Sequence, residues 1–177
     1  VHIWTDRPGG RWPHGGPKTP PPGEPVPPSL DWDLWIGAAP LREYCSLYAP
    51  FKWRGWLDFG CGGLGDMACH IMDPAFFALK LGEAKTFTVE PVRQDEANEQ
   101  TYPSNVVIKY RFPARADMGP VDVFWYENGQ KPPRPEGIPE DQKLGDEDNG
   151  SLFVGEDGWI TAGEYGGDAR LLPDNRM

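Results

Sequence analysis

Residues 62–73 read GGLGDMACHIMD, and this stretch decides the fold of the region around it. Apolar side chains recur at helical spacing behind the glycines, so the sequence predicts a helix over 66–81. Pro74 would cost about 3 kcal/mol inside a helix, but Asp73 before it suits an N-cap with proline in the first turn. We therefore expect a kink or a restart of the helix at this point.

Asp66 and His70 lie four residues apart in this helix and therefore share one face. A carboxylate beside an imidazole raises its proton affinity and fixes its tautomer, which suits proton transfer near neutral pH. The glycines would let a backbone or a ligand approach the helix start closely. Two alternatives stay open at this point. The pair could be a local helix contact, or it could join Asp73 in a metal site, although the ligands are few.

On the N-terminal side, residues 1–4 predict a short strand, and residues 6–28 are too rich in proline for a helix or a central strand. A flexible linker has this composition. Trp12 favours instead an ordered arm across the domain surface, because a tryptophan in a loop usually packs. Asp31 is a suitable N-cap for a short helix that ends at Gly37.

On the C-terminal side the apolar periodicity changes to two, which predicts strands. We expect strands at 86–90, 106–112 and 121–126, and a hairpin of 151–154 with 158–161. The polar residues 127–149 predict a long loop. Strands without interleaved helices indicate a mostly antiparallel sheet, so the predicted fold class is α+β, with helices early and the sheet late.

The totals of the chain exclude several functions. Its 177 residues suit one domain, and a formal charge of −10 offers no basic stripe for nucleic acid or an anionic membrane surface. No apolar run approaches the roughly 18 residues of a membrane span. The three cysteines, Cys45, Cys61 and Cys69, lack the number and spacing of a disulfide framework or a zinc site. Val1 opens directly on a strand pattern, so we expect a piece of a longer protein.

The segment FKWRGW at 51–56 holds weaker candidates. Arg54 and Lys52 could bind hydroxyls or carboxylates, although basic side chains among tryptophans often lie over aromatic faces. Trp53 and Trp56 could stack on a sugar ring, with core packing as the alternative for at least one of them.

Three stretches carry a resemblance to a known family: VHIWTDRP (1–8), SLDWDLWIGAAP (29–40) and FKWRGWLDFGCGGLGDMACHIMD (51–73). In this order they resemble the C-terminal domain of the glucose–fructose oxidoreductase / inositol dehydrogenase (Gfo/Idh/MocA) family, closest to its bacterial branch. The resemblance covers essentially the whole chain and is strongest over 1–8 and 29–82. It implies a mostly antiparallel open sheet with helices on one face and a partner subunit on the other.

The resemblance also implies a catalytic pair, because the family's catalytic Asp and His follow a double glycine that falls on Gly62 and Gly63. His70 would take the proton of a sugar or polyol hydroxyl while the hydride passes to the nicotinamide of NAD or NADP. Asp66 would hold a substrate hydroxyl and orient the histidine. The resemblance further suggests that Trp53, Arg54 and Trp56 line the sugar pocket.

The chain departs from the family in one respect: it contains no N-terminal Rossmann domain and no Glu-Lys-Pro segment. We therefore expect a single substrate-binding and oligomerisation domain (1–177) with an arm (6–28), an active-site helix (66–81) and a sheet (85–172). No cofactor-binding or metal-binding residue is assigned to it, and alone it would be inactive. The alternatives are a domain of an NAD-dependent glycosidase of the same family, and a non-catalytic sugar-binding or assembly module.

Overall fold

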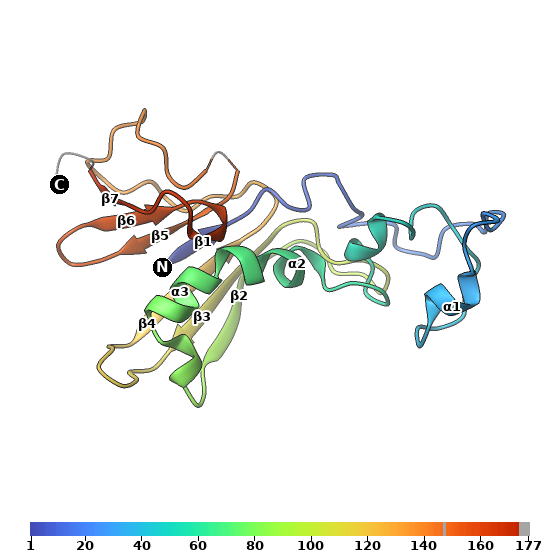
Figure 1. The fold of residues 1–177 in the computed structure, drawn as a ribbon, viewed down its shortest axis with the longest axis horizontal. Coiled ribbons are helices and arrows are strands. Elements are labelled where there is room, and N and C mark those ends of the chain that lie inside the picture. Colours follow the sequence, from blue (N-terminus) through green and yellow to red (C-terminus); the bar gives the residue numbers. More distant parts are fainter. Residues whose placement is uncertain (147, 174–177) are drawn as a thin grey trace.

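A computed structural model of the chain describes residues 1–146 and 148–173. Its centre is a seven-stranded sheet in the order β2-β3-β4-β1-β5-β6-β7 (Figure 1). The strands are β1 (His2–Trp4), β2 (Thr88–Gln94), β3 (Val106–Phe112), β4 (Val121–Tyr126), β5 (Gly150–Val154), β6 (Trp159–Ala162) and β7 (Arg170–Leu172). The α+β class with a mostly antiparallel open sheet is confirmed.

The sheet consists of two antiparallel meanders, β2-β3-β4 and β5-β6-β7, that are joined by β1. β1 runs parallel to β4 and antiparallel to β5. One strand prediction needs correction, and one strand was not predicted. The strand expected at 86–90 lies at 88–94, where it pairs with β3 around a bulge between Pro91 and Arg93. The short strand β7 follows a glycine-rich turn and carries no alternating pattern of its own.

The helix predicted over 66–81 is two helices, α2 (Gly62–Ile71) and α3 (Asp73–Ala78), followed by a 3₁₀ turn at Leu81–Glu83. The restart falls at Asp73 and Pro74, where proline occupies the first turn and its missing N–H costs nothing. The shorter helix α1 (Trp32–Ile36) begins after Asp31, whose side chain accepts a hydrogen bond from Leu34 N, and ends at Gly37. No helix among the described residues is long and apolar enough to span a bilayer.

Helices α2 and α3 lie across one face of the sheet (Figure 1). The core between them and the strands is formed by eight buried residues: Ile3, Met67, Ile71, Ala75, Leu81, Phe112, Val123 and Trp125. The helix that carries Asp66 and His70 is therefore fixed by its apolar side, and its polar side faces away from the sheet.

The opposite face of the sheet is partly covered by the loop predicted at 127–149. Ile138 from this loop is buried with Trp4 and Tyr126, and Leu144 packs against the same cluster. The stretch VDVFWY in β4 is aromatic on both faces for this reason, because the loop covers one face and helix α2 the other. Outside the part that the loop covers, this face carries the ion pairs of Asp122 with Lys109 and Arg111 beside the ring of Phe124.

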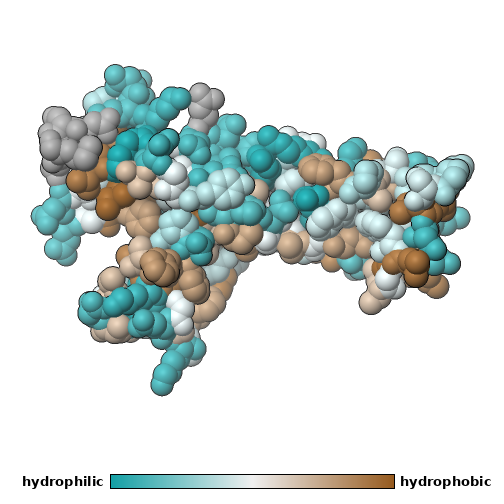
Figure 2. All heavy atoms as spheres, viewed as in Figure 1, coloured by the Kyte–Doolittle hydropathy of each residue, from teal (hydrophilic) through white to brown (hydrophobic). Residues whose placement is uncertain are grey.

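The sequence predicts that segment 6–28 is an arm across the domain surface. In the structure this segment instead packs along the segment around residues 42–60, and the two extend together away from the sheet (Figure 1). Trp12 is 4% exposed and contacts Phe51. A separate small core, built around Trp32, Tyr48 and Trp56, supports the far end of this extension. Figure 2 shows apolar colour at the end of this extension, where α1 lies, and Leu34 of α1 is exposed.

Candidate functional site

Helix α2 begins where two glycines allow other side chains to come close. Gly62 has φ +66°, and a Cβ on it would lie 2.9 Å from the ring of Tyr102. A Cβ on Gly63 would lie 3.1 Å from the carboxyl of Glu127. The sequence predicted that these glycines make room for a backbone or a ligand. In the structure they make room for side chains of the same chain. These contacts fix the start of the helix and thereby the position of Asp66 and His70.

Asp66 is half-buried, and its carboxylate pairs with Arg54 from the 3₁₀ turn η1 (Lys52–Gly55), at 3.1 Å from Oδ1 to Nε. The guanidinium lies over the rings of Trp53 (4.4 Å to the centroid) and Phe51 (4.7 Å), with Trp12 at 5.8 Å. A planar cation stacked on aromatic rings is held in one orientation, so Arg54 directs the Asp66 carboxylate.

His70 is also half-buried, one turn further along the same face of α2. Its imidazole packs edge-on against the ring of Tyr165, with centroids 4.9 Å apart and planes at 63°. Within the described residues no hydrogen bond joins His70 to Asp66, so the expected direct pairing is corrected. The Asp66 carboxylate pairs instead with Arg54, and a guanidinium–carboxylate contact is among the strong hydrogen bonds of proteins.

Tyr165 is the neighbour of His70 that the sequence did not predict. It belongs to η3 (Glu164–Gly166), the turn between β6 and β7, which contacts both α2 and α3. The sequence signal around it is a glycine-flanked tyrosine, GEYGG, which by itself indicates only a turn. The contact depends on the folded sheet, because only the order of its strands brings η3 onto α2.

The remaining candidates from FKWRGW separate in space. Trp53 supports Arg54 and is only partly buried. Trp56 is 0% exposed, and its indole N–H donates to the carbonyl of Leu47 at 2.8 Å. The prediction that Trp56 lines a sugar pocket therefore fails, and the alternative of core packing holds for it. Lys52 is exposed at the start of η1 and is not among the groups that contact Asp66.

A buried carboxyl lies beneath the first turn of α2. Glu127 is 3% exposed and accepts a hydrogen bond from the indole of Trp125 at 2.9 Å. Burial raises the pKa of Glu127 from 4.5 to about 7, although hydrogen bonds from Trp125 and the Leu64 amide oppose this change. It also borders a cavity of about 400 Å³ beside the helix start. Its charge state therefore acts directly on the first turn of the helix.

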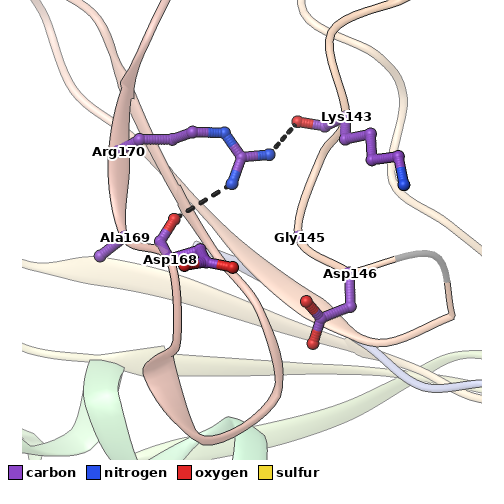
Figure 3. Close-up of a pocket in the computed structure, with 6 residues that line it drawn as sticks. All are labelled: Lys143, Gly145, Asp146, Asp168, Ala169 and Arg170. Atoms are coloured by element: carbon purple, nitrogen blue, oxygen red, sulfur yellow. Dashed lines mark hydrogen bonds between the residues drawn. The ribbon is translucent and has the colours of Figure 1, made fainter.

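Larger hollows than this one lie elsewhere on the surface. A surface hollow of about 680 Å³ is lined by charged groups between residues 143–146 and 168–170 (Figure 3). Its Arg170 is committed to the backbone carbonyls of Lys143 (2.6 Å) and Asp168 (3.0 Å). Among the described residues, no group of three or more His, Cys, Asp or Glu side chains could hold a metal ion. The polar face of α2 thus remains the strongest candidate site.

An open sheet with helices on one face, and a glycine-led helix that presents Asp66 and His70, define an α+β domain with one candidate site. Residues 12–117 match the family model described as "Oxidoreductase family, C-terminal alpha/beta domain" of the Gfo/Idh/MocA group. The chain belongs to the Gfo/Idh/MocA oxidoreductase family. The match spans more than half of the chain, from the arm through α2 and α3 to the end of β3. No curated protein matches the chain significantly.

Proposed function

We propose that this chain is the substrate-binding part of an NAD(P)-dependent oxidoreductase that acts on a sugar or polyol hydroxyl. The observation that carries the proposal is the placement of Asp66 and His70. Both are half-buried on one polar helix face, and each contacts a separate side chain, Arg54 for Asp66 and Tyr165 for His70. Family membership supplies the class of reaction.

In this proposal His70 accepts the hydroxyl proton of the substrate. Histidine is the side chain that most often serves as a general base in enzymes. Asp66, fixed by Arg54, accepts a hydrogen bond from a second substrate hydroxyl and so orients the carbon that is oxidised. Trp53 and the stem of Arg54 provide an apolar edge against which a sugar ring can lie.

These side chains fit a nicotinamide cofactor. When a hydride leaves the carbon that carries a hydroxyl, a base must take the proton of that hydroxyl, and His70 can be this base. NAD or NADP would supply the hydride acceptor. Residues 60–65 read GCGGLG, which has the G-x-G-x-x-G spacing, but they follow the turn η1 and no strand of the sheet leads into them, so we propose no dinucleotide site there. We propose that a dinucleotide-binding domain outside this chain binds the cofactor, and that the chain alone has no activity.

The test uses the full-length protein with NAD⁺ or NADP⁺ and a panel of free sugars, polyols and aryl glycosides. The proposal expects net reduction of the cofactor with a free sugar or polyol. Release of the aryl group without net reduction would instead assign the protein to the NAD-dependent glycosidases. If neither product forms with any substrate, the catalytic proposal fails, and a non-catalytic module remains.

His70→Gln should lower turnover by about 10²–10⁴-fold, the usual contribution of a general base, while the protein still folds. His2→Gln is the matched control. His2 stacks on Phe124 at 5.1 Å and hydrogen-bonds Tyr126 on the face of the sheet opposite α2, so its replacement should leave turnover unchanged. Wild-type turnover in the His70 variant would show that the imidazole is not the base.

A further inference from the structure

Tyr165 has a backbone conformation that its side chain does not favour. Its φ and ψ are 60° and 16°, in the left-handed region, where a bulky residue is a genuine outlier. The side chain is largely exposed, so burial of the ring does not explain why the chain accepts this conformation. Strained residues of this kind persist where the surrounding structure holds them, and they are concentrated at functional sites.

The surrounding structure does hold Tyr165. The amide of Glu164 donates to Asp146 at 2.7 Å, and the Glu164 carboxylate accepts from Asn149 at 2.9 Å. Asn149 is in turn hydrogen-bonded to Thr5, just after β1, at 2.7 Å. Asp146 and Asp168 lie on the two sides of the base of this turn (Figure 3). The turn is therefore tied to the centre of the sheet.

Close packing excludes other positions of the turn. A Cβ on Gly163 would lie 2.4 Å from the Asp146 carboxylate, and a Cβ on Gly166 would lie 3.0 Å from Pro74 at the start of α3. Gly166 also has φ +73°. The turn is thus pressed onto the junction of α2 and α3, and this placement carries the Tyr165 ring to His70.

We propose that Tyr165 is a positioning residue for His70, held in a strained turn so that its ring sets the orientation of the imidazole. This inference rests on the proposed function of His70. The aromatic ring of Tyr165, and not its hydroxyl, has the positioning role, because the ring contacts the imidazole edge-on. The hydroxyl is directed elsewhere: a hydrogen bond with Glu164 raises the pKa of Tyr165, so the hydroxyl stays protonated.

The test compares Tyr165→Gly and Tyr165→Phe in the full-length protein. Tyr165→Gly should lower kcat by about 10–100-fold with little change in KM, because a misplaced base affects the chemical step more than binding. Its Tm should stay equal to or above that of the wild type, because glycine adopts positive φ without strain. Tyr165→Phe keeps the ring and should retain kcat within about twofold, a difference of less than 0.5 kcal/mol.

A third measurement is independent of catalysis. Diethyl pyrocarbonate should modify His70 faster in Tyr165→Gly than in the wild type, with His2 and His14 as internal references in peptide mass spectrometry. If His70→Gln proves fully active, the proposed function fails, yet the modification rates still report on the contact. The positioning role is overturned by wild-type kcat in Tyr165→Gly, by an unchanged modification rate, by loss of kcat in Tyr165→Phe, or by a lower Tm in Tyr165→Gly.

Discussion

Arg54 shows how one side chain can link two parts of the molecule. Its Nε binds the Asp66 carboxylate of α2, while its planar face lies on rings from η1 and, through Trp12, from the arm. The sequence suggested that Arg54 contacts substrate directly. The structure shows that its first partner is Asp66, so we now propose that its effect on substrate passes mainly through that carboxylate.

Arg54→Lys should lower kcat by about tenfold or more, because a hydrogen bond to a charged group contributes about 1.5–3 kcal/mol. Lysine keeps the charge but cannot stack as a plane on Trp53. Steady-state kinetics of the full-length protein would measure this, with the neighbouring exposed Lys52→Gln as the control that should retain activity. Equal kcat for Arg54→Lys and the wild type would remove Arg54 from the site.

Glu127 predicts a pH dependence of stability. Its pKa in the folded protein is about 7, against an ordinary value of 4.5, so the folded form holds its proton more tightly than the unfolded form. The contribution of Glu127 to the free energy of unfolding is therefore fully present below about pH 4.5, and it is lost as the pH rises to about 7. A difference of this size corresponds to about 3 kcal/mol. The free energy of unfolding should therefore fall over this range on account of Glu127.

Glu127→Gln should flatten this decline, because the amide is neutral at every pH and still accepts from Trp125. Urea unfolding at several values between pH 5 and 8 measures it. His2 and His14, whose pKa values burial lowers to about 4, act in the opposite sense, so the difference between variant and wild type is the quantity to compare. The exposed Glu156→Gln is the control. Parallel curves for wild type and Glu127→Gln would contradict the prediction.

At the scale of elements, the contact between the arm and η1 depends on Gly55. A Cβ on this buried residue would lie 2.5 Å from the backbone oxygen of Pro13, and neither backbone can yield easily. This contact is what places Trp12 over Arg54. The proline-rich segment therefore belongs to the folded domain, and this close approach of two backbones is one of the contacts that hold it there, beside the hydrogen bonds from Gly15 to Tyr102 and from Glu24 to Tyr44.

Gly55→Ala should destabilise the protein by about 1–3 kcal/mol, the usual cost of overpacking, and should expose the arm to proteases. Thermal unfolding and limited proteolysis of the full-length protein would show both effects. Gly16→Ala in the same arm is the matched control, since its Cβ would meet nothing within 4 Å. Similar Tm values for the two variants would mean that the close approach does not matter.

The elements also show how far the sequence could be used to predict this molecule. Periodicity located the helices and most strands, and local capping located α1 at Asp31, because these signals lie within a few residues. The start of α2 at Gly62 escaped prediction, because glycine has low helix propensity and only tertiary contacts with Tyr102 and Glu127 hold it there. The contact between Tyr165 and His70 also escaped, because strand order alone creates it.

At the scale of the whole molecule, the exposed part of the sheet is the proposed contact with a second copy of the chain. Asp122 lies there between Lys109 (2.7 Å) and Arg111 (3.0 Å), and Phe124 is covered by Lys109 at 5.2 Å and by His2. This mixed surface of charges around one aromatic ring differs from an apolar core, so the association should be sensitive to salt.

Light scattering of the full-length protein should give the mass of at least two subunits at low salt. The double variant Lys109→Glu/Arg111→Glu reverses the charges on this face and should reduce the mass to that of one subunit. Lys52→Glu, an exposed change of the same sign in η1, should not. A wild-type protein that has the mass of one subunit at every concentration would rule out the proposed assembly.

The central position of β1 has a kinetic consequence. Each three-stranded meander can form from neighbouring segments, but the two halves meet only through residues 2–4, which pair with β4 and β5. Closing the long loops between residues 2–4 and the strands β4 and β5 is entropically unfavourable, and folds that depend on such distant pairings form slowly. During synthesis β1 can pair with β4 only after residue 126 has left the ribosome and with β5 only after residue 154, so the two halves of the sheet are joined late.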